Sequence, residues 1–66
     1  MNEIIKQEVT KNIGEFGTVF LKNNFRYSGI ILGCDSSFIK INDRKQGIKI
    51  ISFSVIQSLH VGDRND

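Results

Sequence analysis

Hydrophobic and polar residues alternate along most of the chain after residue 18, and a period of two is typical of half-buried β-strands. The run FIKIN shows it well, because Ile39 and Ile41 alternate there with Phe38, Lys40 and Asn42. The two isoleucines should face the core, and the other three side chains the opposite face. This pattern predicts five strands: Thr18–Lys22, Phe25–Gly33, Phe38–Asn42, Ile48–Phe53 and Gln57–Val61.

Turn residues and glycines punctuate this pattern. Asn23-Asn24 predicts a turn because Asn tolerates positive φ, and the polar run Asp43–Gly47 predicts a second one. Gly29 and Gly33 lie inside one strand, where glycine marks a bend or a close backbone approach. A sharply bent strand can serve both halves of a small barrel, and closure removes free strand edges. We predict a mainly β chain with a strongly bent, five-stranded antiparallel barrel over about residues 18–61. The predicted core consists of Val19, Leu21, Ile31, Ile39, Ile41, Ile50, Ile56, Leu59 and Val61.

The residues before the strands follow a helical period instead. Met1, Ile5 and Val9 lie four apart and form one apolar stripe, and Asn2 can cap the first turn. We predict a short N-terminal helix over about residues 2–12. Because so short a helix is unstable alone, it should pack against the barrel, most simply at an open end.

The length of 66 residues fits one domain, residues 1–66, with a flexible tail expected at 62–66. So small a domain is marginally stable and usually needs a further source of stability. The single cysteine, Cys34, excludes an internal disulfide, and the single histidine, His60, disfavours a zinc site within one chain. Self-association is therefore the expected source of the missing stability.

Charge and motifs narrow the function classes. The net charge of +2 permits nucleic-acid binding without requiring it. No apolar run approaches the roughly 18 residues of a membrane span, and the N-terminus lacks the features of a secretion signal, so we expect a cytoplasmic protein. The chain has no glycine-rich phosphate loop, paired-carboxylate motif or histidine-based dyad. We expect no enzymatic activity, no cofactor and no metal.

The segment from Val19 to Val61 resembles the Sm-like family, which includes the Sm proteins and bacterial Hfq. The resemblance is carried by VFLKNN and by an aromatic, a glycine and an aliphatic residue at alternate positions, which are Tyr27, Gly29 and Ile31. It implies a helix followed by a bent five-stranded barrel, a ring of six or seven subunits, and binding of single-stranded RNA, with U-rich strands among the candidates. In such a ring the fourth strand of one subunit pairs with the fifth of the next, which would cover an apolar edge strand that is otherwise prone to aggregation.

The match is poorer after Asp35, which the resemblance places at the end of the second strand. Without a gap, the family's base-contacting Asn falls on Ile39, which cannot hydrogen-bond a base. With one extra loop residue, Phe38 takes the base-stacking position and Lys40 the Asn position, and the period of two favours this register because it buries no lysine. The family's Arg-Gly pair is replaced by Ser and Phe residues. The candidate RNA contacts are Asp35, Ser37, Phe38, Lys40, Ser52 and Ser54.

Each candidate also has a purely structural interpretation. Asp35 could accept hydrogen bonds from its own turn, and Phe38 could belong to the core or to a subunit interface. Arg44, Lys45 and Lys49 form either a basic rim that repeats around a ring or an ordinary solvated hairpin.

The function has alternatives too. One is a ring scaffold or protein-interaction module of Sm-like fold that lacks the uridine pocket. Another is a monomeric small barrel from an unrelated translation or chromatin factor.

Overall fold

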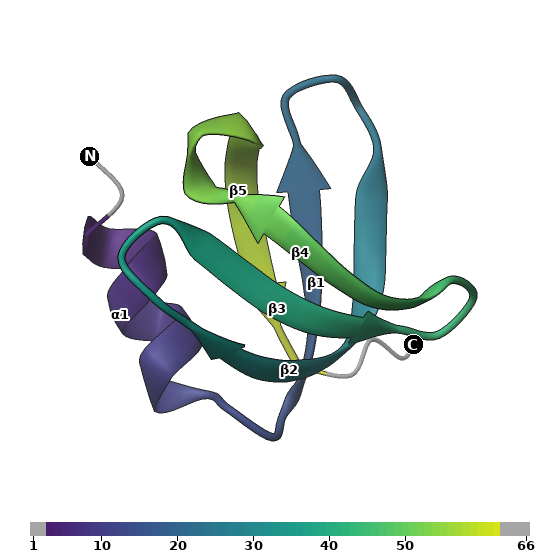
Figure 1. The fold of residues 1–66 in the computed structure, drawn as a ribbon, viewed down its shortest axis with the longest axis horizontal. Helices are drawn as coiled ribbons and strands as arrows, with labels where there is room; N and C mark the ends of the chain where they lie inside the picture. The colour runs from purple at the N-terminus through teal and green to yellow at the C-terminus, as the bar shows by residue number, and fades with distance from the viewer. Residues whose placement is uncertain (1–2, 63–66) are drawn as a thin grey trace.

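A computed structural model describes residues 3–62, and within them it contains one α-helix and a five-stranded antiparallel sheet (Figure 1). The prediction of a mainly β chain with a short N-terminal helix is confirmed. The elements are α1 (Glu3–Lys11), β1 (Phe16–Leu21), β2 (Arg26–Cys34), β3 (Phe38–Asp43), β4 (Gly47–Ser52), the 3-10 turn η1 (Phe53–Val55) and β5 (Ile56–Val61).

The sheet has the strand order β4-β3-β2-β1-β5, in which every neighbouring pair is antiparallel. It curls strongly, so that β3 and β4 pass in front of β1 and β5 in Figure 1. Among the described residues, the end strands β4 and β5 do not pair with each other. The sheet is therefore open, and the predicted closed barrel is not confirmed.

The strand β2 departs from regular pairing near each of its two interior glycines. A Cβ atom at Gly29 would overlap the backbone carbonyl of Asn42 in β3, so only glycine allows this close approach. Further along, the pairing of β2 with β3 shifts between Ile31 and Gly33, which leaves Leu32 as an extra residue. Interior glycines in a strand predict a close backbone approach or a bend, and the close approach is found at Gly29.

The inner face of the curled sheet encloses the core. The 3-10 residue Phe53 is the largest fully buried side chain, and Val9 of α1 covers part of the sheet with no exposed surface. The fold brings β4 over β2, since Lys49 Nζ lies 5.9 Å from the centre of the Tyr27 ring. The buried residues are Val9, Val19, Leu21, Ile31, Ile39, Ile41, Ile51, Phe53 and Ile56.

One predicted core residue was assigned to the wrong face. Ile50 is 66% exposed, whereas its neighbour Ile51 is 6% exposed. The register explains the exchange, because Ile50 lies opposite the exposed Lys40 and Ile51 lies opposite the buried Ile39. Leu59 and Val61, also predicted in the core, are only half-buried.

The segment after α1 joins the sheet earlier than the alternation predicts. Gly14 N–H donates to the Ile31 carbonyl at 2.8 Å, and Ile31 N–H donates to the Glu15 carbonyl at 2.9 Å. These bonds extend the pairing of β1 with β2, so the first strand begins at Phe16 instead of Thr18.

The first residue of the expected flexible tail, Gly62, still pairs with β1. Its N–H donates to the Phe16 carbonyl at 2.8 Å. The rest of that tail, Met1 of the expected apolar stripe and the expected cap Asn2 lie outside the described residues. Within residues 3–62, no helix has both the length and the apolar character needed to cross a membrane.

Candidate functional site

The sheet places most of the predicted RNA contacts at one corner, where β3 begins and β4 ends. Phe38 lies opposite Ser52 in the ladder, and Phe53 N–H donates to the Ser37 carbonyl at 2.9 Å. Lys40 follows on the same face of β3, opposite Ile50. Phe38 and Ser52 are 14 positions apart in the sequence, and the ladder of β3 with β4 makes them neighbours.

Asp35 braces the loop that leads into β3. One carboxylate oxygen accepts hydrogen bonds of 2.8 Å from the N–H groups of Ser37 and Phe38. These two bonds are the main reason why the pKa of Asp35 lies below its ordinary value of 3.8. The interpretation of Asp35 as an acceptor for its own turn is confirmed, and the same bonds fix the backbone at Phe38.

Phe38 lies on the outer face of the sheet. Its side chain is 45% exposed, while Ile39 and Ile41 on either side of Lys40 are fully buried. The periodicity-based orientation of this strand is therefore confirmed, and a core position for Phe38 is wrong. Phe38 and Lys40 line a shallow hollow of about 470 Å³, whose other lining residues are Gly33, Cys34, Asp35, Ile39 and Ile50.

The two serines at the end of β4 interact with each other. Ser52 Oγ caps η1 by accepting a hydrogen bond of 3.2 Å from Ser54 N–H, and the two hydroxyl oxygens lie 2.8 Å apart. A pair of hydroxyl groups that share one hydrogen bond retains one free O–H donor. The pair can therefore still contact a ligand beside Phe38.

The predicted basic rim is not brought together as one cluster. The Arg44 guanidinium lies 5.6 Å from the centre of the Phe16 ring, whereas the Lys49 ammonium lies over Tyr27. Tyr27 pairs with the buried Val19, and Phe16 lies three positions from Val19 in the same strand, so the two rings point to opposite faces. Lys45 stays in the turn beside Arg44.

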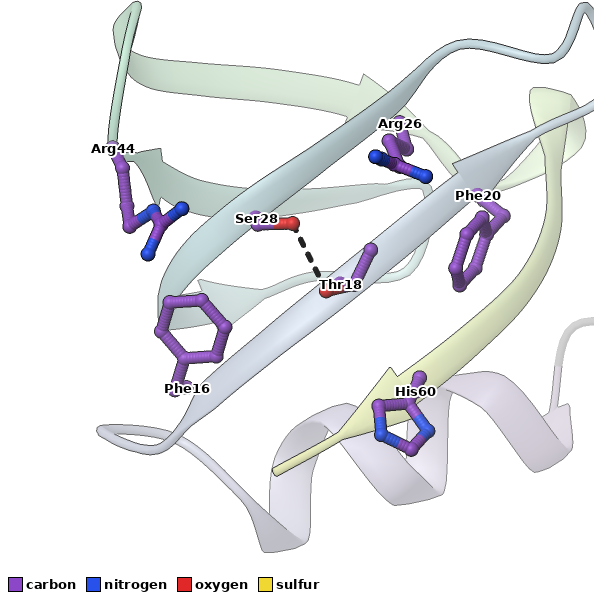
Figure 2. Close-up of a pocket in the computed structure, with 7 residues that line it drawn as sticks. All are labelled: Phe16, Thr18, Phe20, Arg26, Ser28, Arg44 and His60. Carbon is purple, nitrogen blue, oxygen red and sulfur yellow. Dashed lines mark hydrogen bonds between the residues drawn. The ribbon is translucent and has the colours of Figure 1, made fainter. Parts of the chain in front are cut away.

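A second cleft, of about 330 Å³, lies on the outer face of β1, β2 and β5 (Figure 2). Thr18 Oγ1 and Ser28 Oγ lie 2.9 Å apart at its centre. Arg44 lies over Phe16 at one end, and Arg26 lies beside Phe20 at the other. The lining residues are Phe16, Thr18, Phe20, Arg26, Ser28, Arg44 and His60.

The sequence gives only a partial signal for this cleft. The outward positions of β1 follow from the alternation with Val19 and Leu21. Their partners do not, because Thr18 meets Ser28 and His60 only through the ladders of β1 with β2 and with β5. A residue set drawn from four segments becomes visible only once the register is known.

The lining of the cleft carries two cationic side chains, those of Arg26 and Arg44, and no carboxylate. Among the described residues, the one salt bridge joins Lys11 to Glu8, so Arg26 and Arg44 have no carboxylate partner there. The negatively charged Asp43 adjoins them, and its carboxylate accepts backbone N–H bonds from Ser28, Lys45 and Gln46. Across residues 3–62, no three His, Cys, Asp or Glu side chains gather in a way that could hold a metal ion.

The comparison with known proteins adds no assignment to either site. No protein-family model matches the chain, and no curated protein sequence matches it.

Proposed function

We propose that this chain is an RNA-binding protein of the Sm-like type, that it assembles into a homo-oligomeric ring, and that it acts in the cytoplasm. The observation that supports RNA binding best is the exposed ring of Phe38 beside the exposed Lys40, on a backbone fixed by Asp35. Stacking of a base on such a ring is worth about 1–3 kcal/mol. Lys40 supplies a cation for the adjoining phosphate.

The open sheet supports the ring. Its end strands β4 and β5 carry backbone groups that have no partner strand within the described part of the chain. The outer face of β4 also exposes Ile48 and Ile50, at 59% and 66%. Pairing β4 of one subunit with β5 of the next covers both edges, and a contact between two different surfaces closes into a ring of six or seven copies if the rotation allows it.

The molar mass in solution tests the assembly. Light scattering after size-exclusion chromatography should give a single species of six or seven times the chain's 7.5 kDa. A species of 7.5 kDa at micromolar concentration would contradict the proposed ring and would favour the monomeric small domain.

Fluorescence anisotropy with labelled oligo-U and oligo-A at two salt concentrations tests RNA binding. The RNA should bind more weakly at the higher salt, because phosphate contacts release counterions. Phe38→Ala should raise Kd by roughly five- to 150-fold, the equivalent of one stacked base. Phe25→Ala is the matched control, because Phe25 is 63% exposed in the β1–β2 turn and lines neither the hollow nor the cleft.

The second candidate is a ring scaffold or protein-interaction module without RNA binding. It is favoured by the exposed apolar residues on the outer face of the sheet, since large apolar patches mark interaction surfaces. No detectable RNA binding by an assembled ring, even at low salt, would select this candidate. The exposed residues are Ile30, Leu32, Phe38, Ile48 and Ile50.

A further inference from the structure

The edge strand β4 carries one charged side chain among apolar ones. The strand reads GIKIIS, and Lys49 is its only charged residue. Ile48 and Ile50 are exposed on the outer face, and no strand pairs with this edge within the described residues. An apolar edge of this kind tends to pair with the edge of another copy. The single charge in the strand is therefore the feature that can control which strand joins it.

Lys49 points to the inner face of the curled sheet. It lies opposite the buried Ile41 in the ladder, and opposite residues of an antiparallel pair point to the same face. Lys49 is half-buried, and its ammonium lies 5.9 Å from the centre of the Tyr27 ring. The Lys11–Glu8 pair is the one salt bridge of residues 3–62, so no carboxylate neutralises Lys49 there. An inward-pointing charge on an edge strand is a device that opposes edge-to-edge pairing.

Pairing of two β4 strands would bring two copies of this lysine together. A two-fold axis between identical antiparallel strands pairs inner-face positions with inner-face positions. In the register centred on Lys49 the two lysines are directly opposite, with Cβ atoms roughly 5 Å apart. In the next register on either side they are diagonal neighbours, roughly 7–8 Å apart. Like charges that face each other across two strands destabilise the pair.

The contact with Tyr27 keeps this repulsion in force. A lysine has a flexible four-carbon stem, so a fully exposed ammonium can turn away from a like charge. Here the Tyr27 ring is packed against the core and attracts the ammonium to the inner face. Turning away would sacrifice this attraction, so the two charges cannot separate without a cost.

The other free edge presents no such conflict. The strand β5 reads IQSLHV and contains no lysine, arginine, aspartate or glutamate. It has six residues, as β4 has, and its inner-face residues Leu59 and Val61 are only half-buried. We propose that Lys49 excludes pairing of β4 with β4 of a second copy and so leaves β5 as the strand that this edge accepts. The acceptance of β5 rests on the proposed ring, whereas the exclusion of β4 does not.

Cross-linking through a single cysteine tests the exclusion. The full chain carries Cys34→Ser, which removes the one native thiol, and Ile50→Cys, which places a thiol at an exposed position of β4. A short bismaleimide joins two such thiols when two β4 strands lie side by side, whereas β4–β5 pairing separates them by the width of a five-stranded sheet. In this background Lys49→Gln should raise the cross-linked fraction on a denaturing gel by roughly two- to fivefold.

Two control variants and a salt titration separate charge from other effects. Lys49→Arg keeps the charge and should leave the cross-linked fraction unchanged. Lys45→Gln removes an exposed charge from the neighbouring turn, outside β4, and is the matched control for net charge. Added salt should raise the fraction in the chain with Lys49, because screening weakens the repulsion, and should change it little in Lys49→Gln. The rise with salt in the unsubstituted strand does not depend on the folding of any variant at position 49.

A charge swap tests the repulsion directly. Lys49→Glu alone should cross-link no more than the chain with Lys49, because two carboxylates then face each other. A mixture of these two chains, one of them isotopically labelled, should give mixed dimers in excess of both identical pairs, since Lys49 then faces a carboxylate. Mass spectrometry of the cross-linked product identifies the pairs.

The proposal and the ring can fail separately. Equal cross-linking in the chain with Lys49 and in Lys49→Gln, at an unchanged melting temperature, would overturn the exclusion, and so would a mixture without excess mixed dimers. A chain of 7.5 kDa that cross-links through β4 only after Lys49→Gln would contradict the ring and still support the exclusion. A ring whose subunits cross-link equally with and without Lys49 would support the ring and overturn the role of this lysine.

Discussion

The carboxylate of Asp43 accepts a hydrogen bond of 2.8 Å from the backbone N–H of Ser28, which lies 15 residues earlier in the chain. Its other oxygen accepts bonds of 3.0 Å and 2.9 Å from the N–H groups of Lys45 and Gln46. One nearly buried side chain, 8% exposed, therefore ties the β3–β4 turn to β2. The tie also places Arg44 at the end of the second cleft.

Asp43→Ala should lower the free energy of unfolding by about 2 kcal/mol, because three backbone donors lose their acceptor in a partly buried region. Urea denaturation at fixed protein concentration measures the change. Glu15→Ala is the control, since Glu15 is exposed and its carboxylate makes no hydrogen bond within the described residues. An equal loss in both variants would contradict a specific role for Asp43.

Stability should also fall in acid. Burial acts to raise the pKa of Asp43, but hydrogen bonds from Gln46, Ser28 and Lys45 together outweigh it, so this pKa lies below 3.8, as does that of Asp35. A carboxyl whose pKa is lower in the folded state stabilises the fold above its unfolded-state pKa. This contribution is lost as the pH falls below 3.8 and passes through the folded-state pKa values.

Denaturation midpoints measured from neutral to strongly acidic pH test this expectation. The slope of stability against pH below the ordinary aspartate pKa should be smaller in Asp43→Asn than in the unmodified chain. A midpoint that stays constant or rises as acid is added would show that these carboxyl groups do not stabilise the folded state.

The two glycines of β2 should differ sharply in their tolerance of a methyl group. At Gly29 a Cβ would overlap the Asn42 carbonyl, whereas at Gly33 a Cβ would meet no atom within 4 Å. Gly29→Ala should therefore cost more than about 3 kcal/mol or prevent folding, since it forces two paired backbones apart. Gly33→Ala should change stability by less than about 0.5 kcal/mol. Thermal unfolding of the two variants gives the comparison, and similar melting temperatures would contradict the close approach.

Strand positions were predictable where the alternation is unambiguous. In β3 only Ile39 and Ile41 are aliphatic, and they alternate with polar and aromatic residues, so the buried face follows from the sequence. In β4 the run IKII places isoleucines at both parities, and the pattern alone cannot choose between Ile50 and Ile51. That choice is made by the ladder with β3, which is a tertiary feature.

For the candidate sites too, one set of residues could be predicted from the sequence and the other could not. The outward orientation of Phe38 and Lys40 was predictable because both lie in one strand of clear period. The basic rim was not, because Arg44 lies in the turn and Lys49 in β4, and the two side chains lie over aromatic rings on opposite faces of the sheet. Sequence proximity in a hairpin does not imply a shared surface, since each residue's face depends on its place in the pleat.

The assignment of Ile51 to the core and of Ile50 to the outer face can be tested with one pair of variants. Ile51→Ala should lower the free energy of unfolding by roughly 2–4 kcal/mol, because it leaves a cavity beneath a side chain that is 6% exposed. Ile50→Ala should cost less than about 0.5 kcal/mol in the isolated chain, because its side chain is 66% exposed. Urea denaturation over a series of protein concentrations separates the fold from the assembly. A loss in Ile50→Ala that grows with protein concentration would place this side chain in a contact between subunits, whereas equal losses in both variants at every concentration would show that the register of β4 is wrong.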